Sequence, residues 1–127
     1  MYNPANGIID LRSPYSFKET ADRLEALLRA KGIKLFARID QSAEASAVGL
    51  SLRPTILFIF GDPAKGTPWM VAHPALAMDL PLKALVWEAK PGEVYLSYTT
   101  AEFLQQRYQL PTLPFPEIAL LMANVLK

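Results

Sequence analysis

The run at positions 55–60, with the sequence TILFIF, limits the fold of this chain more than any other feature. From Ile56 to Phe60 every side chain is apolar. A short, continuous apolar run is typical of a strand that is buried on both faces. We therefore expect residues 55–60 to form a central strand, with a covering layer on each side of the sheet.

The segments around this run predict a mixed α+β domain. Further strands are expected at 8–11, 33–39, 82–88 and 94–98, and helices at 16–31, 42–49, 100–108 and 118–126. The turn Lys90-Pro91-Gly92-Glu93 predicts a hairpin, because proline presets one turn angle and glycine accepts a positive one. The expected fold is a two-layer antiparallel sheet with helices packed on it, in the order β-α-β-β-β-β-α, with an extra C-terminal helix.

Two of these elements carry clear local signals. Ser16 and Glu19 fit a capping box that begins the first helix, and Gly32 predicts its end. The strand at 33–39 alternates apolar and polar residues, with Phe36 as an exception on the outer side, and this pattern is typical of a half-buried strand. The positions expected to share its inner face are Ile33, Leu35, Ala37 and Ile39.

The segment 61–81 contains four prolines and predicts a long irregular connection, with a helical turn begun by Thr67 and Pro68. Its start, FGDPAKGTP, has the glycine spacing of a phosphate-binding loop at Gly61 and Gly66. Such a loop requires lysine directly after the second glycine, and this chain has Thr67 there. We therefore expect a strand exit and a tight turn, with both glycines selected for their backbone angles.

A two-layer fold leaves one sheet face uncovered, which conflicts with a central strand buried on both sides. The candidates for the missing cover are the segment 61–81, the C-terminal helix and a second copy of the chain. The helix at 118–126 is apolar around most of its girth, which is difficult to satisfy in a small monomer. We therefore expect a homodimer; alternatively, the helix folds back as a third layer.

Composition narrows the functional classes. The length of 127 residues predicts a single domain at 1–127, and the absence of cysteine excludes disulfides, zinc–thiolate sites and cysteine nucleophiles. The formal net charge of +1 gives no electrostatic support for binding nucleic acid or an anionic membrane. The sequence has no signal-peptide pattern and no apolar stretch near the roughly 20 residues of a membrane span. A cytoplasmic protein with no nucleic-acid or membrane partner is expected.

His73 is the only histidine and the main candidate for a general base, with Asp79 or Asp40 as its carboxylate partner. No metal and no cofactor are expected, because the donor side chains are scattered and show no recognised ligand spacing. These donors are Asp40, Glu44, Asp62, His73 and Asp79.

Several blocks of the sequence together resemble the domain of unknown function 302 family of bacterial and archaeal proteins. The blocks are ETADRLEALLRAKGIKLFARID, VGLSLRPTILFIFGDPAKGTPWM, ALAMDLPLKALVWEA and EVYLSYTTAEFL. The resemblance covers residues 8–110 and leaves 112–127 as a helical extension. It implies a TATA-binding-protein-like α+β fold and dimers, and it brings no established activity. The family usually has histidine where this chain has Gln41 and asparagine where it has Asp62, and glutamine cannot titrate as histidine does.

Three functions are consistent with these features. The preferred one is a dimeric small-ligand or partner-binding module without catalysis, with His73 at the rim of its site. The walls expected for that site are Asp40, Gly61, Asp62, Gly66, Thr67 and Asp79. The second is a hydrolase or isomerase that uses His73 with a carboxylate. The third is a structural or interaction protein that acts through its C-terminal helix.

Overall fold

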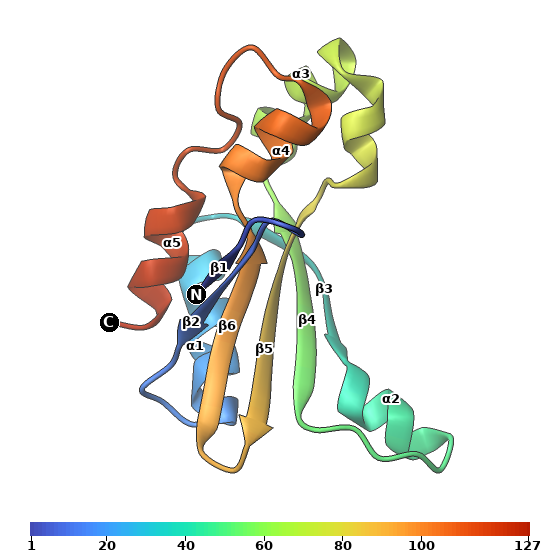
Figure 1. Ribbon diagram of the computed structural model, residues 1–127, viewed down its shortest axis with the longest axis vertical. Coiled ribbons are helices and arrows are strands. Elements are labelled where there is room, and N and C mark those ends of the chain that lie inside the picture. The colour runs from blue at the N-terminus through green and yellow to red at the C-terminus, as the bar shows by residue number, and fades with distance from the viewer.

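The computed structural model describes all 127 residues and confirms an α+β domain built on one antiparallel sheet (Figure 1). The strands are β1 (Tyr2–Asn3), β2 (Ile8–Arg12), β3 (Lys34–Asp40), β4 (Thr55–Gly61), β5 (Leu82–Lys90) and β6 (Glu93–Thr99), in the spatial order β1-β2-β6-β5-β4-β3. The helices are α1 (Phe17–Ala30), α2 (Gln41–Ala47), α3 (Pro63–Ala72), the 3-10 helix η1 (Pro74–Met78), α4 (Ala101–Tyr108) and α5 (Ile118–Val125). The expected order holds, with β1, α3 and η1 added to it.

Helix α1 begins and ends where the sequence predicts. The hydroxyl of Ser16 accepts a hydrogen bond from the backbone N–H of Glu19 at 3.1 Å, which satisfies one free donor of the first turn. After the helix, Gly32 has a φ of +69°, a conformation that other residues rarely adopt. The helix then packs Leu24 and Leu28, both fully buried, against the sheet.

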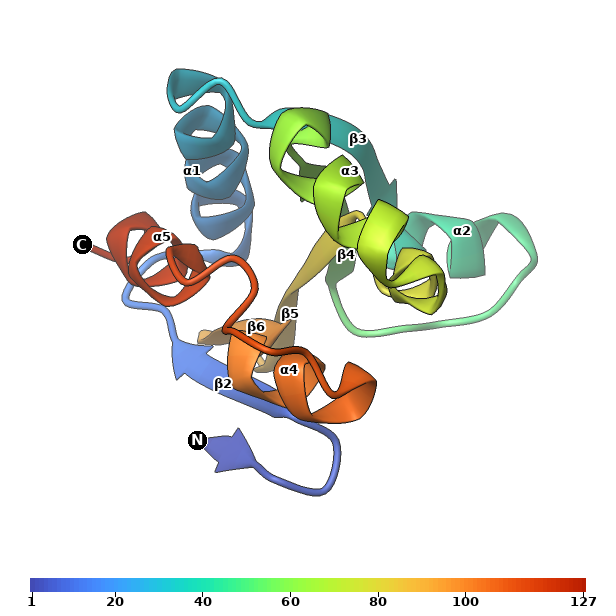
Figure 2. The same ribbon diagram turned by 90° about the horizontal axis from the view of Figure 1, so that it is seen from above.

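One face of the sheet carries the hydrophobic core, and α1 and α5 both lie against it (Figure 2). Strand β4 contributes Ile56, Phe58 and Phe60, none of which is more than 5% exposed. Burial of a large apolar side chain stabilises a fold by about 1.5–3 kcal/mol. This face is therefore the main source of folding free energy.

The opposite face of β4 differs from the expectation. Leu57 and Ile59 are only half-buried, and no helix of the chain packs over them. The segment 61–81 lies beyond the end of the sheet and α5 packs beside α1, so neither supplies the expected cover. We call this surface the open face. Its apolar residues, identified by the strand register, are Ala37, Ile39, Leu57, Ile59 and Leu85.

The C-terminal helix α5 buries one side within the chain, while its Leu120 remains 62% exposed. Its buried residues are Ile118, Leu121, Met122 and Val125. Arg23 of α1 donates a hydrogen bond from Nε to the carbonyl oxygen of Val125 at 2.8 Å. The helix thus folds back into the layer of α1 and forms no third layer.

Strand β3 contains a bulge that its alternating sequence did not predict. Leu35 pairs with Phe60 and Ala37 pairs with Ile59, so Phe36 is an extra residue in the ladder. A bulge shifts the residues that follow it to the opposite face. Leu35 therefore faces the core and Ala37 the open face, contrary to the expectation that they share one side.

The segment 61–81 was expected to be irregular, but it holds the helices α3 and η1. Asp62 begins α3, because its Oδ1 accepts a hydrogen bond from the backbone N–H of Ala64 at 3.0 Å. Pro63 takes the first helical position, where the missing N–H has no cost, and Pro74 does the same in η1. Two of the four prolines therefore begin helices, and only Pro68 lies inside one.

Candidate functional site

An open cavity of about 530 Å³ lies where β3 begins and β4 ends. Its walls come from the C-terminal end of α1 and from β3, β4, β5, α3 and α5. The volume is in the range of about 300–1,000 Å³ that is usual for small-molecule sites. The hydrophobic residues that line it are Ile33, Phe36, Phe60, Met70, Leu80, Leu82, Phe115, Ile118, Leu120 and Leu121. The cavity is therefore largely apolar.

The two glycines of the opening motif both line this cavity, but neither has a positive φ. The expectation that they were selected for unusual backbone angles is therefore wrong. Gly66 lies inside α3, where its N–H donates to the carbonyl oxygen of Asp62 at 2.8 Å. That N–H is not free to bind a phosphate, so the segment does not have the geometry of a phosphate-binding loop.

We expect the Gly66→Ala variant to be more stable than the natural chain by about 0.5–1 kcal/mol, because alanine favours a helix over glycine. An added Cβ would meet Leu80 Cδ1 at 3.8 Å, an ordinary contact. Gly49→Ala is the control: its φ is +79°, so alanine there should be destabilising by about 1 kcal/mol. Urea unfolding measures both changes, and a destabilised Gly66→Ala variant would contradict the geometry described for α3.

Charged residues stand at the rim of the cavity. Lys65 of α3 and Glu117, just before α5, form an ion pair at 3.4 Å, with side chains 62% and 50% exposed. Such exposed pairs contribute little to stability, so this pair does little to hold α3 against the start of α5. The carboxylate of Asp62 caps α3. Lys31, at the end of α1, also lines the cavity and forms no salt bridge in the chain.

The structure brings together four of the six residues expected to form the walls: Gly61, Asp62, Gly66 and Thr67. Asp40 lies at the far end of β3, where it caps α2 by accepting a hydrogen bond from the N–H of Ala43 at 2.9 Å. A hydrogen bond from the hydroxyl of Ser42 is the main cause that lowers the pKa of Asp40. Asp40 therefore belongs to a helix cap and not to this cavity.

Asp79 and His73 are also outside the cavity. The Asp79 carboxylate accepts a hydrogen bond from the hydroxyl of Tyr108 and forms a salt bridge with Arg107 at 3.1 Å. Burial, followed by this hydrogen bond, raises the pKa of Tyr108. The ring of His73 lies beside Trp69, with centroids 6.1 Å apart, and has no carboxylate partner. The expected pairing of His73 with Asp79 or Asp40 is absent.

Sequence and structure comparisons place this chain in a known family. The Domain of unknown function DUF302 matches residues 9–127, which is nearly the whole chain. This chain belongs to the DUF302 family. The matched residues include α5.

The relatives of this DUF302 chain include a crystal structure of a conserved DUF302 protein from Bacillus stearothermophilus. That structure has a TM-score of 0.79 and 18% sequence identity, and it covers 94% of this chain and 95% of the other. Two curated relatives, named Fluoride-specific ion channel FluC 1, come from Brucella suis biovar 1 and Brucella abortus biovar 1. Each is 38% identical over 105 residues, and the match spans 83% of this chain but only 41% and 39% of those proteins. In the present chain, none of the helices has the length and apolar character that a bilayer crossing requires.

The sequence identified only four of the 20 residues that line this cavity. Met70 of α3, Lys31 after α1 and the α5 residues Ile118, Leu121 and Asn124 all line it. Lys31 and the α5 residues are distant in sequence from the segment 61–81, so only tertiary packing brings them to the cavity, whereas Met70 lies in the same helix as Thr67. The one available signal was the apolar girth of α5, which was interpreted as a contact with a second copy.

Proposed function

We propose that this DUF302 chain binds a small amphipathic molecule, with an apolar body and one anionic group, in the cavity between α3 and α5. The observation that carries the proposal is the cavity of about 530 Å³ itself, lined by ten hydrophobic residues and open at a charged rim. An apolar pocket with a few convergent polar groups is the usual form of a small-molecule site.

The charges at the rim support an anionic group on the ligand. Lys65 and Glu117 neutralise one another, and Asp62 is engaged at the N-terminus of α3, where the helix dipole favours a negative charge. Lys31 is the rim cation that no side chain of the protein neutralises. A carboxylate, sulfonate or phosphate on the ligand would pair with the ammonium group of Lys31.

Binding without catalysis is the function that fits these residues best. The cavity has no histidine and no cysteine among its walls, and no cluster of three or more His, Asp or Glu side chains in the chain is arranged to hold a metal. The name of the Brucella relatives describes proteins of which this match spans about two fifths. Fluoride conduction is therefore not part of the proposal.

Isothermal titration calorimetry with two probes tests the proposal: 8-anilinonaphthalene-1-sulfonate, which is apolar and anionic, and N-phenyl-1-naphthylamine, which is apolar and neutral. We expect one saturable site, with the anionic probe bound more tightly. Met70→Glu should lower the affinity for both probes at least 10-fold, because it places a carboxylate among the apolar side chains that line the cavity. Met78→Glu is the matched control, since Met78 is 77% exposed and lies outside the cavity.

Lys31→Met separates the two parts of the proposal. This variant should bind the anionic probe about 10-fold more weakly, because one charge-assisted contact is lost, and its affinity for the neutral probe should be unchanged. Equal effects of Met70→Glu and Met78→Glu would refute the cavity as the site. If the anionic probe binds the Lys31→Met variant as tightly as the natural chain, the anionic group on the ligand is refuted, but the cavity as the binding site is not.

A further inference from the structure

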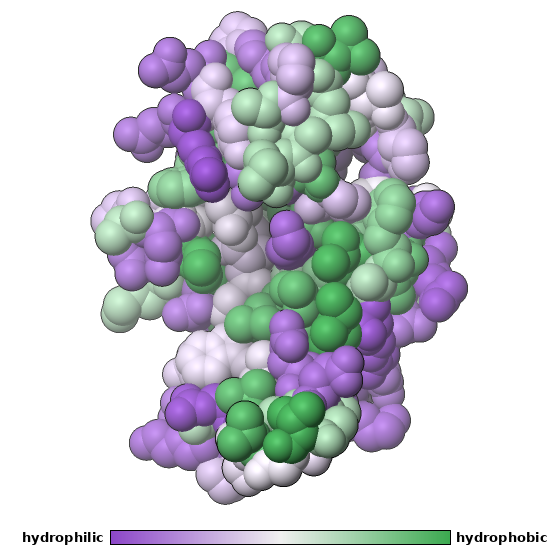
Figure 3. Space-filling view, turned by 90° about the vertical axis from the view of Figure 1, so that its right-hand side faces the viewer, coloured by the Kyte–Doolittle hydropathy of each residue, from purple (hydrophilic) through white to green (hydrophobic).

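Two phenylalanines present their rings to the cavity instead of the hydrophobic core. Phe36 of β3 and Phe115, in the segment between α4 and α5, both line the cavity. Phe36 is 44% exposed, and the surface seen from the side of β3 carries a group of apolar side chains near its middle (Figure 3). Phe115 is half-buried and does not pack against the core. Phe60 also lines the cavity, but it is only 1% exposed and belongs to the core.

The bulge in β3 places Phe36 at the cavity. Phe36 is the extra residue between the paired positions Leu35 and Ala37. Its ring lies beside Gly61 of β4, where an added Cβ would be 3.9 Å from Cε2 of Phe36. Nζ of Lys34 lies 4.8 Å from the centroid of the same ring, and Lys34 does not line the cavity. Bulges are common next to functional sites, because they change the direction of a side chain.

Phe115 has a backbone conformation that a bulky residue rarely adopts. Its φ is +48°, and the proline that follows it further favours an extended backbone. Gln109 is the other non-glycine residue with a positive φ, but it ends α4, where a left-handed residue is common. Phe115 does not end a helix. Strained backbone of this kind often occurs at ligand-binding sites, because the surrounding structure must hold it in place.

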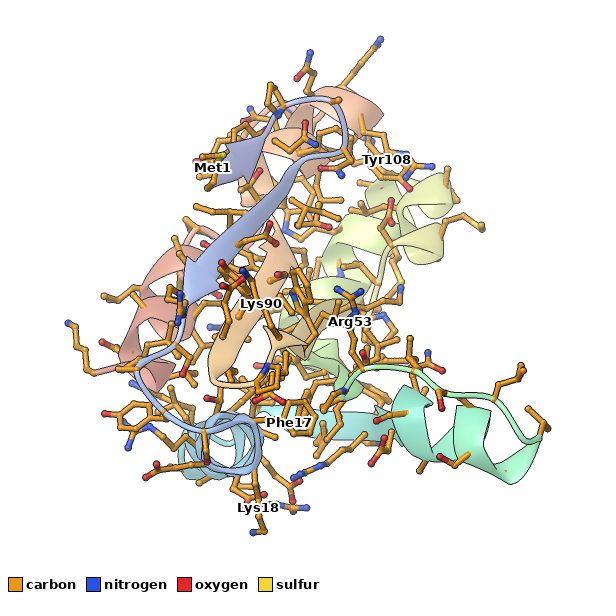
Figure 4. All side chains as sticks on the ribbon, turned by 60° about the horizontal axis from the view of Figure 1, so that its bottom comes forward. Met1, Phe17, Lys18, Arg53, Lys90 and Tyr108 are labelled. Atoms are coloured by element: carbon orange, nitrogen blue, oxygen red, sulfur yellow. The ribbon has the colours of Figure 1, made fainter.

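Besides these phenylalanines, no aromatic side chain lines the cavity. Trp87 stacks on Tyr95 on another part of the sheet, with ring centroids 5.1 Å apart. The hydroxyl of Tyr108 donates to Asp79, and Phe17 lies at the start of α1, far from Tyr108 (Figure 4). Phe36 and Phe115 are therefore the aromatic surface that a ligand in the cavity can contact.

We propose that the apolar part of the ligand is a planar aromatic ring system, which packs on Phe36 and Phe115 while the anionic group pairs with Lys31. This inference rests on the function proposed above and narrows the ligand to an aromatic acid. Offset or edge-to-face aromatic pairs add roughly 2–10-fold to the affinity beyond the effect of buried area. A saturated ring system has no π-electrons and is puckered, so it lacks this gain. The gain also accounts for a phenylalanine at position 115, where the backbone disfavours it.

Isothermal titration calorimetry of the full chain with two matched acids tests the proposal. The acids are naphthalene-2-acetate and its saturated analogue, decahydronaphthalene-2-acetate. Both have the same carbon skeleton and carboxylate, and the saturated acid has the larger apolar surface. If buried area alone decided the affinity, the saturated acid would bind at least as tightly. We expect the aromatic acid to bind about 3-fold more tightly or better.

A double variant, Phe36→Leu with Phe115→Leu, should abolish this preference, because it keeps apolar side chains at both positions and removes the rings. Leu120→Ala is the matched control. Leu120 also lines the cavity and is 62% exposed, so its truncation should lower the affinity for both acids by the same factor. If the double variant fails to fold by circular dichroism, a second measurement on the natural chain replaces it. Nuclear Overhauser effects are then expected between the naphthalene protons and the ring protons of Phe36 and Phe115.

The outcomes separate this inference from the function on which it rests. Equal affinities for the two acids, tighter binding of the saturated acid, or a preference that survives in the double variant would overturn the aromatic ligand. The absence of the expected nuclear Overhauser effects would do the same. In each of these cases small-molecule binding in the cavity still stands. If neither acid binds and 8-anilinonaphthalene-1-sulfonate does not bind either, the proposed function fails together with this inference.

Discussion

The Gly7→Ala variant is expected to lose about 3 kcal/mol or more of unfolding free energy, which is exceptional for the addition of one methyl group. Gly7 is buried in the turn between β1 and β2 and has a φ of +73°. An added Cβ would lie 2.1 Å from Cγ and 2.5 Å from Cβ of Phe103 in α4. These atoms are close to the helix backbone, so the ring cannot move away without shifting α4. The carbonyl oxygen of Gly7 also accepts a hydrogen bond from the N–H of Thr100, which begins α4.

Two variants separate the clash from the backbone conformation. Gly92 has a φ of +83° and nothing within 4 Å of an added Cβ, so Gly92→Ala should have only the left-handed penalty of about 1–2 kcal/mol. In a Phe103→Ala background, the loss caused by Gly7→Ala should become smaller, because the ring atoms are gone, but it should stay above the value for Gly92→Ala, because Cβ of residue 103 remains 2.5 Å from the added Cβ. Urea unfolding measures all four variants. Equal effects of Gly7→Ala and Gly92→Ala would contradict the packing of α4 against the β1–β2 turn.

The Phe58→Ala variant is expected to lose about 3–5 kcal/mol, because it removes a fully buried ring from the centre of the core. Leu57→Ala, at the adjacent position of β4, should cost less than about 2 kcal/mol in the monomer, since Leu57 is already half exposed on the open face. Thermal and urea unfolding at low protein concentration compare the two. Similar losses would show that both faces of β4 are buried within one chain, contrary to the fold described above.

The sequence predicted the elements whose signals are local. The capping box at Ser16, the glycine after α1 and the Pro91-Gly92 turn each depend on residues within a few positions, and all three elements formed as expected. The same holds for α4, because Thr100 Oγ1 accepts a hydrogen bond from the N–H of Phe103 at 3.3 Å. These elements can therefore be predicted without information about distant parts of the chain.

The errors arose where distant contacts or ambiguous residues decide the structure. Proline begins a helix as readily as it ends one, so Pro63 and Pro74 were interpreted as breaks although Asp62 gave a cap signal. The bulge at Phe36 cannot be seen in an alternating sequence, because the pairing partner sets the register. The apolar run at 55–60 indicated an interior strand, and β4 lies between β5 and the edge strand β3, but the run did not indicate which side the chain itself covers.

The candidate site was predicted only in part, because some of its residues are brought together by distant contacts. The segment after β4 gave Gly61, Asp62, Gly66 and Thr67, because a strand end followed by a helix start places these residues at one edge of the sheet. The contributions of α1 and α5 depend on tertiary packing and could not be inferred from the sequence. Asp40 was assigned to the site through its charge alone, although the structure uses that charge to cap α2.

Methyl NMR of the chain labelled with ¹³C at its methionines tests the central claim most directly, because the four methionines sample different surroundings. Met70 lines the cavity, whereas Met1 and Met78 are 92% and 77% exposed outside it and Met122 is buried in the core. On titration with 8-anilinonaphthalene-1-sulfonate, we predict that the Met70 methyl signal shifts in a saturable manner while those of Met1 and Met78 stay in place. A Met70 signal that does not move at saturation, or a shift of Met78 in its place, would contradict ligand binding between α3 and α5.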